Sequence, residues 1–121
     1  GPARLAAIVD WEMGTVGDPL LDLAWVVMGW PDEGEVRTGG YVDYTGMPNR
    51  DDLLDHYATV SGRNVDDIDY YVVLARFKLA IVLEGGYARY VAGRADNPKM
   101  EAFGGVVLDL AARAAELVRA I

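Results

Sequence analysis

Apolar and polar positions along the chain predict one short strand followed by four helices. The run Leu5–Val9 is too short for a stable helix and too continuous for a half-exposed strand, a pattern typical of a strand buried on both faces. Such a strand cannot satisfy its own backbone N–H and C=O groups, and each buried group left unpaired costs on the order of 1–3 kcal/mol. The pattern therefore indicates either a piece of a longer protein or an oligomer that supplies the partner strand.

Two helices are predicted in the first half of the chain. A loop with two glycines and a proline interrupts the apolar pattern, which resumes as a helix over Leu20–Met28. A long polar and glycine-rich connection follows over residues 29–48, and the sequence leaves open whether it folds over apolar surface or acts as a lid. Asn49 is a good N-cap and Gly62 a good C-terminal stop, so we expect an amphipathic helix over Arg50–Ser61.

Two longer helices complete the chain. The body Tyr70–Val91 is apolar on nearly all sides, so we expect it in the middle of the fold with neighbours on several faces. Its Gly85-Gly86 pair lets a neighbour or a ligand approach the backbone closely. The last helix, about Lys99–Ile121, carries one apolar stripe opposite a charged face.

Composition and charge exclude several classes of function. The 121 residues are 52% apolar, enough for one domain with a core, and the absence of cysteine excludes disulfides and thiolate metal sites. His56 is the one histidine, so zinc is not expected. The net charge of −8 disfavours nucleic acid as a partner. No apolar run is long enough to cross a bilayer, so we expect a cytoplasmic protein without a membrane partner.

Three aspartates flank the first loop. Asp10 stands at the end of the predicted strand, where a carboxylate either holds a hard cation such as Mg²⁺ together with phosphates or caps the following turn. Asp22 interrupts an apolar helix, which indicates either a buried acid held by N–H donors or an exposed acid on a narrow polar stripe. Asp18 precedes Pro19 and is expected to cap the helix. The residues alone leave the alternatives for Asp10 and Asp22 open.

Several motifs in this sequence resemble a known family. The segments Ile8-Val9-Asp10-Trp11-Glu12, Gly17-Asp18-Pro19-Leu20 and Asp22-Leu23-Ala24 resemble the motif (I/V)DWE…GDPxxDLA of the aminoglycoside phosphotransferase-like kinases. The later segments 70–80 and 85–90 are similar to the long helix of the branch that is also found fused to some acyl-CoA dehydrogenases. The resemblance spans most of the chain. It implies a mainly α fold, the helical C-terminal lobe portion of a protein-kinase-like structure with one short N-terminal β-strand.

The resemblance implies separate roles for two of the aspartates. Asp10 matches the acid that holds Mg²⁺ on the phosphates of ATP, and Asp22 matches the acid that braces the catalytic loop. The N-terminal lobe and a catalytic loop of the form H-G-D-x-x-x-x-N would lie upstream. Residues 1–121 are therefore expected to be the C-terminal helical part of a phosphotransferase domain, with residues 1–2 a cloning remnant.

The same resemblance predicts that this chain alone is inactive. The catalytic aspartate is expected upstream, and no H-x-D pattern occurs in the sequence. His56 is followed by Tyr57 and Ala58, so it is expected at the surface or in an interface.

The substrate implied by the family is a small molecule with a hydroxyl group, whose identity the sequence does not give. The acidic composition favours a cationic or neutral substrate over a phosphorylated one. Aromatic residues at helical spacing are more often core than ligand contacts, but five of them are candidates for the substrate site: Trp30, Tyr41, Tyr44, Tyr87 and Tyr90.

A second interpretation is a non-catalytic helical interaction or dimerisation module in which the acids are structural. Both interpretations predict a homo-oligomer of this chain, because an uncovered apolar surface tends to find a partner.

Overall fold

The fold is mainly helical, as predicted. The computed structural model describes residues 4–31 and 42–121, which form four α-helices and two short 3₁₀ helices. Their order is η1 (Trp11–Met13), α1 (Pro19–Val27), α2 (Arg50–Ser61), α3 (Ile68–Val91), η2 (Pro98–Ala102) and α4 (Phe103–Ala120). No helix in this described part of the chain is long and apolar enough to cross a membrane.

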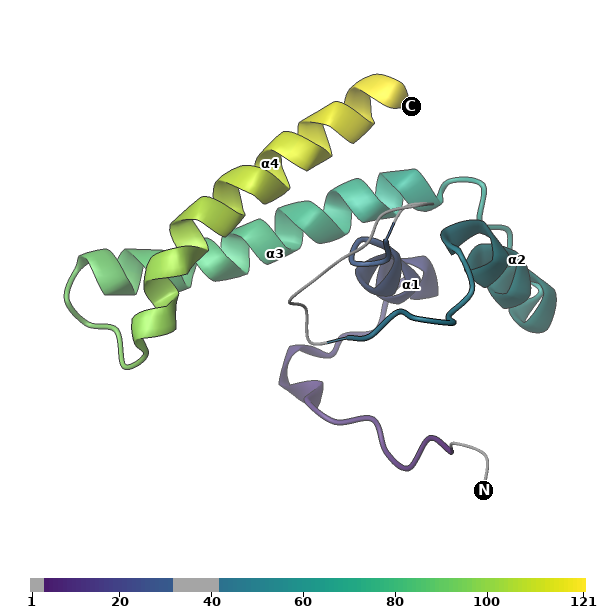
Figure 1. The fold of residues 1–121 in the computed structure, drawn as a ribbon, viewed down its shortest axis with the longest axis horizontal. Helices are drawn as coiled ribbons and strands as arrows, with labels where there is room; N and C mark the ends of the chain where they lie inside the picture. The colour runs from purple at the N-terminus through teal and green to yellow at the C-terminus, as the bar shows by residue number, and fades with distance from the viewer. Residues whose placement is uncertain (1–3, 32–41) are drawn as a thin grey trace.

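The long helix α3 is the element against which the others are arranged (Figure 1). Helix α4 returns antiparallel along α3, and Arg76 Nη1 of α3 donates to the carbonyl oxygen of Arg113 in α4 at 3.1 Å. Helix α1 packs against the N-terminal half of α3, with α2 beside it. The N-terminal segment runs away from the helices (purple in Figure 1).

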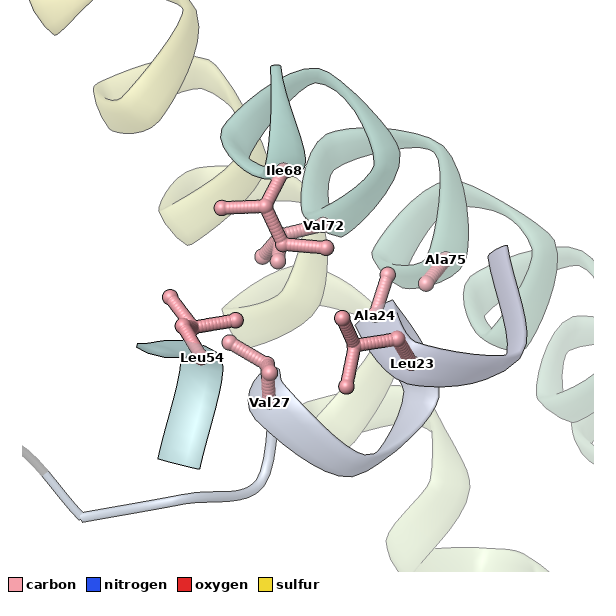
Figure 2. Close-up of a cluster of buried hydrophobic side chains, with 7 residues drawn as sticks. All are labelled: Leu23, Ala24, Val27, Leu54, Ile68, Val72 and Ala75. Atoms are coloured by element: carbon pink, nitrogen blue, oxygen red, sulfur yellow. The ribbon is translucent and has the colours of Figure 1, made fainter. Parts of the chain in front are cut away.

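A small hydrophobic core joins α1, α2 and the first half of α3 (Figure 2). Ala24 and Ala75 are both 0% exposed, and their small side chains allow α1 and α3 to lie close together. No residue of α4 is buried, although Leu117 packs against the edge of this core. The buried members are Leu23, Ala24, Val27, Leu54, Ile68, Val72 and Ala75.

The predicted N-terminal strand is not formed. Residues 4–10 have no regular secondary structure, and no strand occurs in the ranges 4–31 and 42–121. The side chains of Leu5, Ile8 and Val9 are 81%, 61% and 77% exposed, so the expected burial on both faces is wrong for this structure. The physical reason is that a strand needs backbone hydrogen bonds to a neighbouring strand, and none of the described segments provides one.

The predicted helix ends are confirmed at the capping residues. Asp18 Oδ1 accepts a hydrogen bond from the N–H of Leu20 at 2.9 Å, which caps α1. Helix α2 has the predicted bounds, with the side chain of Asn49 as acceptor at its start and Gly62, at φ 70°, at its end. Helices α1 and α3 begin within two residues of the predicted starts, whereas the last helix begins four residues later than predicted, because 3₁₀ helix η2 precedes α4.

Helix α3 has fewer neighbours than its composition predicted. Val72 and Ala75 are buried toward α1, but Tyr70, Phe77 and Ile81 are 59%, 60% and 57% exposed. These three residues are spaced by seven and four, so they form one stripe along the helix. The expectation of neighbours on several faces is therefore wrong for this side of α3. We call Tyr70, Phe77 and Ile81 the α3 stripe.

Glycines let α3 and α4 interlock at their connected ends. A Cβ atom at Gly86 would lie 2.8 Å from Cδ2 of Phe103, and one at Gly104 would lie 2.8 Å from the ring of Tyr87. Each helix thus presents a glycine to an aromatic ring of the other. The prediction that the glycine pair of α3 admits a close neighbour is confirmed for Gly86, whereas Gly85 faces open space.

Candidate functional site

The three predicted aspartates line one open groove between the N-terminal segment and α1. The groove has a volume of about 940 Å³, within the range of about 300–1,000 Å³ typical of small-molecule sites. We call it the Asp10 groove. Its lining residues are Ile8, Val9, Asp10, Trp11, Gly14, Thr15, Val16, Gly17, Asp18, Leu21, Asp22, Trp25, Val26 and Lys78.

Asp10 has an unusual backbone conformation in this groove. Its φ of 69° and ψ of 53° lie in the left-handed region, and it is the one non-glycine residue with positive φ among those the structure describes. Aspartate adopts this conformation more readily than most residues do. Its side chain is exposed and makes no capping hydrogen bond to η1, so the turn-capping interpretation of Asp10 is wrong.

The turn after Asp10 is held by its backbone and by Trp11. The indole Nε1 of Trp11 donates to the carbonyl oxygen of Ile8 at 2.8 Å, and the N–H of Gly14 donates to the carbonyl oxygen of Trp11 at 2.8 Å. A Cβ atom at Gly14 would lie 2.9 Å from that carbonyl oxygen, so the turn requires glycine there. The Asp10 carboxylate takes no part in these contacts and stays available to the groove.

Asp18 and Asp22 differ in their surroundings. Asp18 Oδ2 accepts a hydrogen bond from the Tyr71 hydroxyl at 2.7 Å in addition to its capping bond. The Tyr71 hydroxyl, followed by the N–H of Leu20, lowers the pKa of Asp18 below its ordinary value of 3.8. Asp22 is exposed in this structure, which corresponds to the polar-stripe arrangement among its two interpretations.

The donor set of the groove fits a hard cation only in part. Carboxylate oxygens are the ligands that Mg²⁺ prefers, and it usually takes one or two of them together with water and phosphate oxygens. No group of three or more His, Cys, Asp or Glu residues that could hold a metal occurs within residues 4–31 and 42–121. Asp10 can therefore contribute one ligand to an ion that phosphates and other groups complete.

Lys78 also lines the groove, and the sequence analysis missed it. It belongs to α3, and its role depends on how α3 packs beside α1. The signal that could have found it is the lysine within the otherwise apolar run 77–83 of α3. Its ammonium group gives the groove one cation beside the three carboxylates, a combination suited to a ligand with phosphates and a metal ion.

Two of the five aromatic candidates lie together. The rings of Trp30 and Tyr44 meet edge to face at 5.2 Å, and the Tyr44 hydroxyl donates to the carbonyl oxygen of Gly29 at 3.1 Å. Trp30 Nε1 donates to the carbonyl oxygen of Pro48 at 3.0 Å, so the end of the long connection folds back onto its beginning. Tyr41 lies outside the described residues.

The other two aromatic candidates lie elsewhere. Tyr87 packs on Gly104, and Tyr90 interacts with Glu101, whose carboxylate raises the pKa of Tyr90 above its ordinary value. Trp30 lies beside Arg76 of α3, because both line one cavity, and Tyr87 is eleven residues beyond Arg76, about 16 Å along the helix axis. Trp30 and Tyr44 therefore do not share one pocket with Tyr87 and Tyr90. His56 is exposed on α2, as expected.

The motif around the groove matches a protein family. Residues 1–56, which include all three aspartates, match the family described as "Phosphotransferase enzyme family". The predicted resemblance is confirmed. The phosphotransferase match ends within α2, so Lys78 and the α3 and α4 pair lie beyond it.

Curated relatives match a larger part of the chain. "Acyl-CoA dehydrogenase family member 11" from Gallus gallus is 32% identical over 123 residues, covering 95% of this chain and 16% of that protein. The protein of the same name from Homo sapiens is 31% identical over 113 residues, covering 89% and 14%. "Acyl-CoA dehydrogenase family member 10" from Mus musculus is 28% identical over 101 residues, covering 78% and 9%.

The chain thus spans about one sixth of the length of the relatives it matches most fully. No solved structure matches it.

Proposed function

We propose that this chain is the metal-loop and helical portion of an ATP-dependent phosphotransferase that transfers phosphate to a hydroxyl group of a small molecule. The observation that carries the proposal is the Asp10 groove, in which Asp10, Asp22 and Lys78 line one open space. The match of residues 1–56 to the phosphotransferase family supports the same chemistry.

In this proposal Asp10 holds Mg²⁺ on the nucleotide phosphates. When it is bound, the ion neutralises negative charge on the phosphates. Asp10 suits this role because its carboxylate is exposed to the groove and has no capping partner. Residues held in sparsely populated backbone regions often serve a site, and the left-handed conformation of Asp10 is such a feature.

Asp22 is proposed as a positioning residue that braces the catalytic loop of a complete phosphotransferase domain. It is exposed at the groove, where a neighbouring loop can reach it with backbone N–H donors. Asp22 does not touch substrate in this proposal. Its replacement by Asn is expected to lower phosphoryl transfer by about tenfold to a hundredfold, the range seen when a group that orients a metal site is removed.

The catalytic base and a second metal ligand are expected from a preceding H-G-D-x-x-x-x-N loop, so the 121-residue chain alone is proposed to be inactive. The test measures Mg²⁺-dependent phosphoryl transfer from ATP by the chain alone and by a complete phosphotransferase domain that contains it. We expect transfer only from the complete domain, and a loss of about a hundredfold or more in Asp10→Asn.

The control for this experiment is Asp96→Asn, which removes an exposed carboxylate outside the groove and should leave the rate unchanged. Asparagine also tolerates the left-handed region, so Asp10→Asn removes the charge and keeps the backbone. Turnover by the isolated chain that disappears in Asp10→Asn would contradict the proposed inactivity.

A helical interaction module is the second candidate function, and the exposed apolar residues favour it. The α3 stripe and the residues Leu5, Ile8, Val9 and Trp11 leave much apolar side-chain surface uncovered. Mg²⁺-dependent ATP binding by the complete domain separates the two candidates, because a pure interaction module predicts none. Self-association of the isolated chain is compatible with both.

A further inference from the structure

A second cavity contains three arginines from three different helices. It has a volume of about 410 Å³ and lies between the end of α1, the start of α2, the first half of α3 and the end of α4. Arg50, Arg76 and Arg113 line it, from α2, α3 and α4 respectively. We call it the arginine pocket. None of the described residues that line it also lines the Asp10 groove, so an inference about this pocket does not rest on the proposed phosphotransferase function.

The arginine pocket has the opposite charge balance to the chain. Among residues 4–31 and 42–121, three arginines and two acids, Asp69 and Glu116, line it. The lining from this described part of the chain carries one more positive than negative group, whereas the whole chain has a net charge of −8. A local concentration of one charge in a cleft with apolar walls raises the local concentration of ions of the opposite charge.

Described acids engage only part of the guanidinium groups of Arg50 and Arg113. Arg50 Nη2 pairs with Asp69 at 2.5 Å, and Arg113 Nε pairs with Asp109, which does not line the pocket, at 2.9 Å. A guanidinium carries five N–H donors. The two terminal nitrogens of Arg113, and Nε and Nη1 of Arg50, make no hydrogen bond to any residue within 4–31 and 42–121.

These donors suit a planar oxyanion. Arginine recognises carboxylate and phosphate through paired N–H donors, and such charge-assisted bonds are about twice as strong as neutral ones. Helix pairing alone does not explain three guanidiniums at one cavity, because Arg113 already pairs with Asp109 within its own helix. Arg76, which bonds the carbonyl oxygen of Arg113, instead sets the spacing between α3 and α4 at the pocket.

The remaining wall of the pocket is apolar. Val27, Val72 and Leu117 line it, and Trp30 adds an indole ring. Apolar side chains beside several convergent charged groups can hold the two ends of a small organic molecule, and the volume lies within the range of about 300–1,000 Å³ typical of such sites. We propose that the arginine pocket binds a small organic anion, with a carboxylate or a phosphate monoester on the arginines and an apolar group against Val72, Leu117 and Trp30.

The proposal is tested on the 121-residue chain with four probes that share one alkyl tail: hexyl phosphate, hexanoate, hexanol and hexylammonium. Calorimetry should detect saturable binding of at least one of the two anions, and neither of the other probes should bind. The comparison of the two anions then distinguishes a phosphate from a carboxylate ligand. In amide NMR spectra the shifts should centre on Val72 and Leu117.

Arg113→Gln should weaken anion binding about tenfold or more, because it removes a charged donor to the ligand. Arg119→Gln is the matched control, since it makes the same charge change on the same helix at an exposed position outside the pocket, and should change affinity less than about twofold. If circular dichroism shows that Arg113→Gln loses helical structure, the variant Arg50→Gln is used instead, and it should also weaken anion binding about tenfold or more.

The proposal fails if neither anion binds saturably at millimolar concentration. It also fails if Arg113→Gln and Arg119→Gln weaken binding equally, which indicates non-specific charge attraction. A third result against it is that the NMR chemical-shift changes centre on residues of the Asp10 groove.

Discussion

Asp18 connects the first loop, α1 and α3 through its two carboxylate oxygens. One oxygen accepts from the N–H of Leu20 at 2.9 Å, and the other accepts from the Tyr71 hydroxyl at 2.7 Å. Both contacts favour the ionised carboxylate, which explains the lowered pKa of Asp18. The same contact favours the neutral phenol and raises the pKa of Tyr71 above its ordinary value of 10.0. The pair therefore stabilises the fold only while Asp18 is charged and Tyr71 is neutral.

Tyr71→Phe should lower stability most between about pH 5 and pH 9, where both partners are in the favoured state. Asp18 has a folded pKa below its unfolded value, so its contribution is present above pH 3.8 and is lost as the pH falls through the folded pKa. Tyr71 has a raised folded pKa, so its contribution is present below pH 10.0 and is lost above it. Urea unfolding across this pH range measures the difference from wild type.

The control is the adjacent Tyr70→Phe, which removes a hydroxyl from an exposed tyrosine outside this contact. Its effect should be small and independent of pH. An effect of Tyr71→Phe that does not change from pH 3 to pH 11 would show that the hydroxyl acts in some way other than through Asp18.

The interlock of α3 and α4 uses one glycine from each of two neighbouring pairs. In α3, Gly86 touches the ring of Phe103 while Gly85 faces open space, and in α4, Gly104 touches Tyr87 while Gly105 faces open space. Glycine in a helix costs roughly 0.5–1 kcal/mol relative to alanine. The structure explains the cost at Gly86 and Gly104, because a side chain there would collide with an aromatic ring. It gives no reason for glycine at Gly85 or Gly105.

Alanine at the two α3 glycines should act in opposite directions. Gly85→Ala should raise the free energy of unfolding by about 0.5–1 kcal/mol, since it adds helix propensity in open space. Gly86→Ala should lower it by about 1 kcal/mol or more, because its Cβ would lie 2.8 Å from Phe103 and force the ring to move. Thermal or urea unfolding measures both, and equal stabilisation by the two variants would contradict the interlock.

The elements that the sequence predicted correctly are those with local signals. Asn49 and Gly62 gave the bounds of α2, and Asp18 before a proline gave the start of α1, because capping involves residues within one turn. The strand over Leu5–Val9 failed for the opposite reason. Its apolar run is visible locally, but a strand is stable only with a paired neighbour, and the described residues contain none.

The candidate site was predictable only in part. The family resemblance named Asp10 and Asp22, and the structure adds that Asp10 is left-handed and that Lys78 shares the groove. The arginine pocket could not be predicted, because Arg50, Arg76 and Arg113 are separated by 26 and 37 residues and meet only when α4 returns along α3. Charge counted along the sequence favoured a cationic or neutral ligand, whereas the pocket is locally basic.

The described residues together leave a large apolar surface uncovered. The α3 stripe and the N-terminal residues Ile8, Val9 and Trp11 are each more than half exposed. We propose that the rest of a complete phosphotransferase domain covers this surface, and that in its absence a second copy of the chain does so. Apolar residues aligned on one helix face are the usual means of such association.

The isolated chain should therefore self-associate, with a mass in light scattering that rises above the monomer as concentration increases. The double variant Phe77→Glu and Ile81→Glu should remain monomeric, because charges on the α3 stripe cannot be buried without a partner. The variant Val60→Glu, at an apolar position on α2 that is 73% exposed, should still associate. A wild-type chain that stays monomeric at high concentration would contradict this prediction.

Whether Asp10 holds Mg²⁺ for a nucleotide in the Asp10 groove can be measured through the affinity of a complete phosphotransferase domain for ATP. Calorimetry with Mg²⁺ and with EDTA should show that Mg²⁺ raises the affinity about tenfold or more in the wild type, since the ion joins the carboxylate to the phosphates. In Asp10→Asn, ATP should bind with the same affinity under both conditions. An Asp10→Asn domain that kept the full Mg²⁺ dependence would contradict the claim.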